Sequence, residues 1–101
     1  MENTLKNPAP DQSEAEALAI EALVFLSGEE KRFQRFLSIT GLDPSTLRQV
    51  AKQTNFLASI LDYIMQDESL LLQFCEMNAI DPDLVPSSRT VLGKDLPGQF
   101  E

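Results

Sequence analysis

Two segments of this chain, 38 residues apart, carry the same signals for ending one helix and starting the next. The first is ITGLDPSTLRQVA, from Ile39 to Ala51, and the second is MNAIDPDLV, which starts at Met77. In the first segment Gly41 suits the left-handed end of a helix, while Asp43 and Pro44 suit the cap and first position of a new one. No stretch has the alternation or the β-branched content of a strand. The sequence therefore predicts an all-α protein with tight helix-to-helix turns.

The similarity between the two segments extends into the helix that precedes each turn. Seven positions match at this offset, namely Glu30, Phe33, Phe36, Gly41, Leu42, Asp43 and Pro44 against Glu68, Leu71, Phe74, Ala79, Ile80, Asp81 and Pro82. Two such units are too few for a solenoid, which needs three or more repeats. We interpret them as two similar helix-turn-helix hairpins of one bundle, which arose either by duplication or by coincidence.

Apolar periodicity and capping signals predict a compact bundle of five main helices plus one short helix. The first begins at Ser13, whose spacing to Glu16 matches a capping box, and it ends at Gly28. The others are expected over 29–40, from 44, from a cap at 54 or 55 to 66, and over 68–79. The short sixth helix is expected over 87–92, because Pro86 should interrupt the chain before it. We expect one helical domain at 13–92, a disordered segment at 1–12 and a flexible tail at 93–101.

Charge is spread unevenly along this acidic chain, whose net charge is −8. Residues 1–30 carry one lysine and seven acids, giving −6, and residues 62–101 carry two basic side chains and eight acids, again giving −6. Residues 31–61 carry five basic side chains and one acid, giving +4. The whole molecule should repel nucleic acids and anionic membranes, and only the basic middle runs against that expectation.

The first of these helices is apolar around nearly its whole circumference, which is typical of a helix that is central or half covered by another subunit. The LLLQFC segment likewise covers more than one face of its helix. The expected core residues of that helix are Leu70, Leu71, Leu72, Phe74, Cys75 and Met77. Because a chain of 101 residues has difficulty burying so much apolar surface alone, we expect a patch for a protein partner or a homodimer. The predicted partner surface consists of Ile20, Val24, Leu70 and Leu72.

The alternative hypothesis is a nucleic-acid-binding helix-turn-helix that uses the basic segment 31–52. Its apolar residues and the glycine at the turn fit that motif, and its polar side chains suit phosphates and base edges. The predicted contacts are Lys31, Arg32, Arg35, Arg48, Gln49 and Lys52. Two features oppose this hypothesis: Asp43 lies at the start of the would-be recognition helix, and the second hairpin repeats the turn without basic residues.

The sequence carries little that points to catalysis. Cys75 is the single cysteine and the chain has no histidine, so we expect a buried thiol rather than a nucleophile or half of a disulfide. The acids Asp62, Asp67, Glu68 and Glu76 are expected to be helix caps and a solvated face. We therefore expect no enzymatic activity, no cofactor, no metal and no small-molecule substrate.

The apolar segment Leu18 to Leu26 is interrupted by Glu21 and is too short to cross a bilayer. Residues 1–13 are polar and contain two prolines, which does not match a signal peptide. We therefore expect a cytoplasmic protein without a membrane segment.

Four segments together resemble a family of small uncharacterised alphaproteobacterial proteins, domain-of-unknown-function family 3572. They are AEALAIEALVFL, RFLSITGLDPSTLRQVA, FLASILDYIMQDESLLLQF and the later Asp81-Pro82. The resemblance covers roughly residues 13–92. It implies an all-helical bacterial cytoplasmic protein, and it brings no activity, ligand or catalytic residue.

Overall fold

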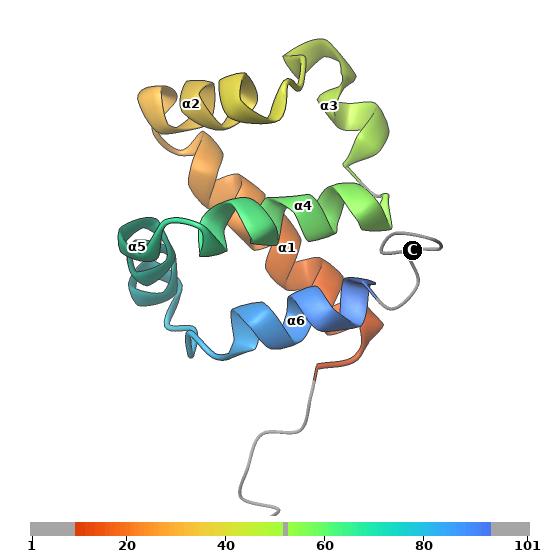
Figure 1. Ribbon diagram of the computed structural model, residues 1–101, viewed down its shortest axis with the longest axis vertical. Coiled ribbons are helices and arrows are strands. Elements are labelled where there is room, and N and C mark those ends of the chain that lie inside the picture. Colours follow the sequence, from red (N-terminus) through yellow and green to blue (C-terminus); the bar gives the residue numbers. More distant parts are fainter. Residues whose placement is uncertain (1–9, 52, 94–101) are drawn as a thin grey trace, which may run out of the picture.

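The computed structural model describes residues 10–51 and 53–93, and within these ranges the chain is all-α, as predicted. Six helices follow one another: α1 Gln12–Ser27, α2 Glu30–Thr40, α3 Pro44–Val50, α4 Thr54–Met65, α5 Glu68–Asn78 and α6 Leu84–Gly93. Helices α1 and α4 lie in the middle of the molecule, with α2 and α3 on one side and α5 and α6 on the other (Figure 1). Most of each predicted disordered end lies outside the described residues. The described part differs from the prediction, because Gln12 begins α1 and Gly93 ends α6.

The start of α1 differs from the prediction. Asp11, not Ser13, is the cap residue: its Oδ1 accepts from the Glu14 N–H at 2.8 Å, and the Asp11 N–H donates to Glu14 Oε1 at 3.0 Å. This is a capping box two residues upstream of the expected one, and the acidic side chains also interact favourably with the positive end of the helix. At α4 the predicted cap at Thr54 or Asn55 is wrong as well, because Gln53 holds that position without a side-chain bond.

The last helix is longer than predicted. We expected Pro86 to break the chain, yet α6 begins at Leu84 and runs through it. Pro86 is the third residue of the helix, where its missing N–H removes no intrahelical hydrogen bond. The short helix of the six is instead α3, with seven residues.

The two predicted hairpins match in backbone detail. Gly41 and Ala79 both adopt the left-handed conformation, with φ of 74° and 54°. The next N–H in each turn donates back to an equivalent carbonyl, Leu42 to Leu37 at 3.2 Å and Ile80 to Cys75 at 2.9 Å. This 6→1 bond satisfies a carbonyl that the helix end leaves free.

The aspartate that follows each turn makes the same side-chain hydrogen bond in both hairpins. Asp43 Oδ1 accepts from the Ser45 N–H at 2.9 Å, and Asp81 Oδ1 accepts from the Asp83 N–H at 3.0 Å. Because all these equivalent bonds are 38 residues apart, the hairpins are alike in structure as well as in sequence.

The left-handed Ala79 offers a test of this turn. A residue with a Cβ is strained at φ 54°, whereas glycine is not, so Ala79→Gly should raise the free energy of unfolding by up to about 1 kcal/mol. Ala17→Gly is the matched control, since the same change in the exposed face of α1 should lower stability by about 1 kcal/mol. Urea denaturation measures both, and an Ala79→Gly protein no more stable than the wild type would contradict the strain.

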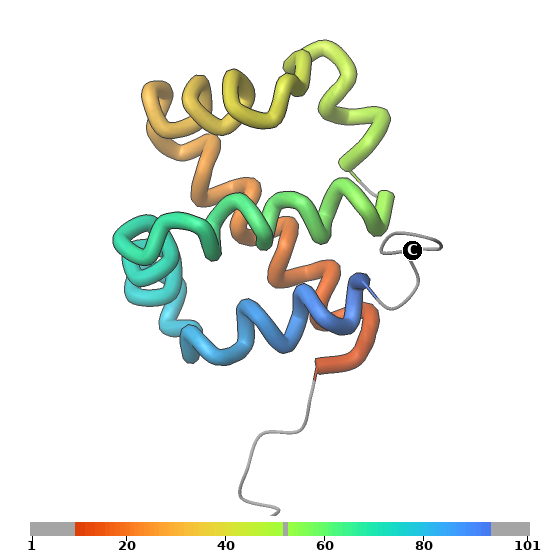
Figure 2. Tube along the Cα trace, viewed as in Figure 1, coloured from red at the N-terminus to blue at the C-terminus, as the bar shows by residue number. Residues whose placement is uncertain are grey.

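The repeat includes a third helix that the sequence comparison did not reveal. Helices α1 and α4 end at Ser27 and Met65, which are also 38 residues apart, and the residue after each has nearly the same backbone angles. Helix α1 contacts α2, and α4 contacts α5. The molecule thus consists of two three-helix units, α1–α3 and α4–α6, whose paths can be followed in Figure 2.

Aromatic side chains join the two units, because a ring of each unit packs on a ring of the other. Phe25 of the first unit packs on Phe74 of the second, with ring centroids 5.4 Å apart. Tyr63, the equivalent of Phe25, packs edge-on against Phe36, the equivalent of Phe74, at 5.0 Å. Such reciprocal contacts are expected of two units related by an approximate two-fold rotation.

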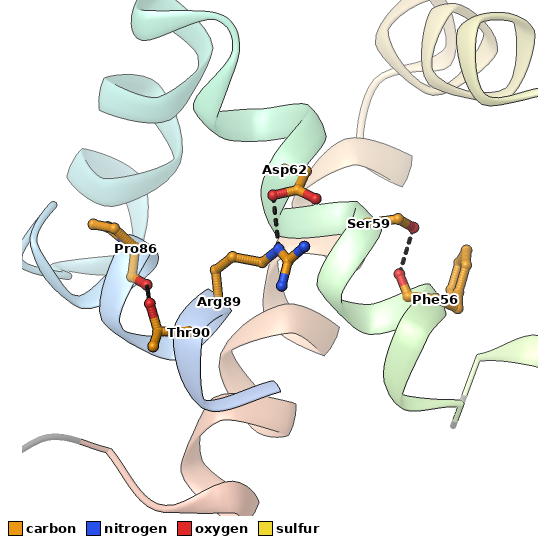
Figure 3. A network of polar contacts seen from close by, with 6 residues as sticks. All are labelled: Phe56, Ser59, Asp62, Pro86, Arg89 and Thr90. Atoms are coloured by element: carbon orange, nitrogen blue, oxygen red, sulfur yellow. Dashed lines mark hydrogen bonds and ion pairs between the residues drawn. The ribbon is translucent and has the colours of Figure 1, made fainter. Parts of the chain in front are cut away.

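The third helices of the two units differ in their packing. Helix α6 lies against both α1 and α4, burying Val85, Ser88 and Leu92, and Arg89 Nε donates to Asp62 Oδ1 of α4 at 2.7 Å (Figure 3). Helix α3 buries no side chain and makes no comparable contact with either central helix. The approximate symmetry is therefore broken at α3.

Candidate interaction surface

Helix α1 has one buried face and one exposed apolar stripe. The alanines of the buried face, Ala15, Ala19 and Ala22, are completely covered. On the opposite side Ile20 is 43% exposed and Val24 is 63% exposed. These two side chains are four residues apart and so lie one turn above each other, forming what we call the outer stripe of α1.

A third apolar side chain lies beside the outer stripe. Met77 of α5 is 72% exposed, and it lines a groove of about 400 Å³ together with Val24. The other lining residues are Glu21, Phe25, Gly28, Arg32 and Asn78. We expected Met77 in the core, and that prediction is wrong, because it lies near the end of α5 and outside the core formed around Phe74 and Cys75.

The structure does not bring the predicted partner surface together as one patch. Leu70 is half-buried, and Leu72 is exposed but lines a different hollow, beside Cys75, Ile80 and Pro82. Leu72 and Met77 are five residues apart, which places them about 140° apart around α5. Val24 instead has Met77 of α5 as its neighbour in the groove, and Ile20 lies one turn away from Val24 along α1.

Acidic side chains border the outer stripe. Glu16 lies one turn before Ile20, at the start of the stripe. Glu21 lies at the side of the stripe, within one turn of Val24. From its cap to its end α1 carries four acids and no basic side chain. The electrostatic potential around the outer stripe is therefore negative, except near the basic side chains at the start of α2.

Arg32, one of the predicted nucleic-acid contacts, is engaged within the protein. Its Nη2 donates to the Phe25 carbonyl oxygen at 2.7 Å, its guanidinium carbon lies 4.1 Å from the centre of the Phe25 ring, and its Nη1 lies 3.4 Å from Glu29 Oε1. The Phe25 carbonyl belongs to the last turn of α1, where a positive charge is favourable. Arg32 therefore caps α1 and joins it to α2.

The remaining basic positions do not gather on one helix face. Lys31 and Arg35 are exposed one turn apart on α2, whereas Arg48 and Gln49 are exposed on α3. Arg48 and Gln49 are consecutive, so their side chains diverge by about 100°. Lys52 lies outside the described residues.

Cys75 is buried in the core, as predicted. Burial, and secondarily the negative charge of Asp81, raise the pKa of its thiol, which favours the protonated form. Of the acids expected to act as caps, Asp67 accepts from the Leu70 N–H at 3.2 Å.

Neither a metal-binding group nor a membrane span occurs in 10–51 and 53–93. No three histidine, cysteine or acidic side chains in these ranges gather as a metal site would require. No helix there has both the length and the apolar character needed to cross a bilayer.

Comparison with known proteins identified the family of this chain. Neither the curated proteins nor the solved structures contain a match to this chain. A family model described as a protein of unknown function (DUF3572) matches residues 12–95, a range that includes all six helices. The chain therefore belongs to the DUF3572 family.

Proposed function

We propose that this protein is a non-enzymatic protein-interaction module whose contact surface is centred on the outer stripe of α1. The observation that carries the proposal is the grouping of three large, exposed apolar side chains, Ile20, Val24 and Met77, on two adjacent helices. Single exposed apolar residues are common on any protein, whereas a grouped patch is typical of a binding surface.

The energetics of this patch suit a partner that also supplies polar contacts. Complete burial of one such side chain contributes roughly 1.5–3 kcal/mol, and these three are already partly covered. Their combined contribution is therefore only a few kcal/mol, which must offset an association cost of about 4–15 kcal/mol. Because Glu16 and Glu21 flank the patch, a partner segment with an apolar centre and basic edges fits it best.

The nucleic-acid hypothesis has weaker support. Arg32 is bound to the end of α1, and Arg48 and Gln49 diverge on a separate helix. The basic side chains that remain exposed are equally suited to meeting acidic protein surfaces.

Photo-crosslinking in the cells that make the protein tests the proposal. A photoreactive amino acid at Val24 or at Met77 should give covalent adducts with a partner protein. The matched control is the same amino acid at Thr90, an exposed residue of α6 outside the groove. Adducts at Val24 and Met77 but not at Thr90 are expected, and Ile20→Glu should reduce the Val24 adducts. Equal yields at all three positions, or none at Val24, would contradict the proposal.

A further inference from the structure

The internal repeat shows what a covered version of the outer stripe looks like. At an offset of 38, Ile20 and Val24 of α1 correspond to Ala58 and Asp62 of α4. In the second unit these positions lie beside α6: Ala58 is 1% exposed, and Asp62 accepts the hydrogen bond from Arg89. In the first unit the same positions are apolar and open to solvent. The outer stripe of α1 is therefore the equivalent of a surface against which a helix packs in the other half of the molecule.

The helix that would cover the stripe by analogy is α3. Its residues Leu47 and Val50 correspond to Val85 and Ser88, which α6 buries completely. In α3 both contact the core of their own chain but remain only half-buried. The chain thus has two matching faces, the outer stripe and the apolar side of α3, and neither is fully covered.

Within one chain these two faces are kept apart. Helix α3 is held at its start by the Gly41 turn, and the Gln53 N–H donates back to the Val50 carbonyl at its end at 2.9 Å. Both neighbours are anchored in the core, α2 by Phe36 and α4 by several buried side chains. With its ends held in this way, α3 does not pack on α1 as α6 packs on α4.

Charge also matches between the two faces. The outer stripe is flanked by Glu16 and Glu21 on a helix without basic residues. Helix α3 exposes Arg48, and its one nearby acid, the cap residue Asp43, is bound to the Ser45 N–H at the other end of the helix. Opposite charges favour contact between Arg48 and the acidic side chains of α1, whereas like charges disfavour contact between two copies of α1.

We infer that this chain forms a two-fold dimer in which α3 of each copy packs on the outer stripe of α1 in the other, as α6 packs on α4. The arrangement is reciprocal, so it closes at two copies and covers the outer stripe together with the exposed part of the apolar side of α3. This inference rests on the proposed function, and it identifies the partner as a second copy of this chain.

Sedimentation velocity over a micromolar to submillimolar concentration series tests the inference. The full chain should shift from monomer to dimer as its concentration rises, and the shift should weaken with salt, because the flanking charges are exposed. Val24→Glu, on the stripe, and Arg48→Glu, on α3, should each weaken the dimer at least about tenfold. Both side chains are exposed, so circular dichroism should show an intact fold. Thr90→Glu is the control and should dimerise as the wild type does.

Mixing the two variants separates the reciprocal dimer from other arrangements. In a mixed dimer the intact α3 of the Val24→Glu copy meets the intact α1 of the Arg48→Glu copy, so one of the two contacts is restored. The mixture should therefore associate more strongly than either variant alone. A variant pair that gains nothing on mixing would overturn the inference. So would a wild type that stays monomeric, or a dimer that only Val24→Glu disrupts, the pattern expected of α1 pairing with α1.

The photo-crosslinked adducts distinguish failure of this inference from failure of the proposed function. Adducts of the Val24 probe that contain two copies of this chain support both. Adducts that contain only a different protein support the proposed function and overturn the dimer. Absence of adducts at Val24, together with a monomeric wild type, would contradict both the proposed function and the dimer.

Discussion

Replacing Phe74 by alanine should lower the free energy of unfolding by about 3–5 kcal/mol. The Phe74 side chain is completely buried, and its ring packs on Phe25, so the change removes core contacts and leaves a cavity between the two units. Small domains are stable by roughly 5–15 kcal/mol, so this one substitution removes a large share of the total. Urea denaturation followed by circular dichroism measures the loss.

The same helix provides the control for this experiment. Leu72 is 47% exposed on α5, and Leu72→Ala should cost less than about 1 kcal/mol. Phe36→Ala should cost nearly as much as Phe74→Ala, since Phe36 is equally buried at the equivalent position of the first unit. A Phe74→Ala protein as stable as Leu72→Ala would show that the contact between the units contributes little.

Enlarging a buried alanine of α1 should also have a large effect. Ala19 has no exposed surface on the face that α1 turns towards α4 and α6, so Ala19→Leu should force neighbouring helices apart and cost about 1–3 kcal/mol or more. Ala17→Leu adds the same atoms two residues away on the exposed face and should change stability by less than about 0.5 kcal/mol. Thermal unfolding of the two variants compares them directly, and equal melting temperatures would contradict the close packing of α1.

The features that the sequence predicted well are governed by local chemistry. Gly41 and Asp43 determine a turn through their own backbone and side-chain preferences, so the hairpins could be recognised before any tertiary contact was known. The errors arose where two local signals compete. Asp11 with Glu14 fits a capping box as well as Ser13 with Glu16 does, and a proline ends a helix or begins one according to its position in the first turn.

The candidate surface was predicted only in part, because it depends on tertiary packing. The all-round apolar character of α1 pointed to Ile20 and Val24, which are exposed. Nothing in the spacing of Met77 distinguishes it from a core residue, and its exposure beside Val24 is seen only once the helices are packed together. Arg32 was counted as a free charge because its acceptor, the carbonyl of Phe25, belongs to a different helix.

The exchanged aromatic contacts have a consequence for how this chain folds. Phe25 of the first unit finds its ring partner, Phe74, in the second unit. Phe36 stacks on Phe33 of its own helix, and its edge-on partner, Tyr63, also belongs to the second unit. Neither three-helix unit therefore completes its own hydrophobic core, and a fragment ending at the α3–α4 connection would expose aromatic surface. Folding and unfolding should accordingly proceed as a single cooperative transition, in which the two halves of the chain gain their order together.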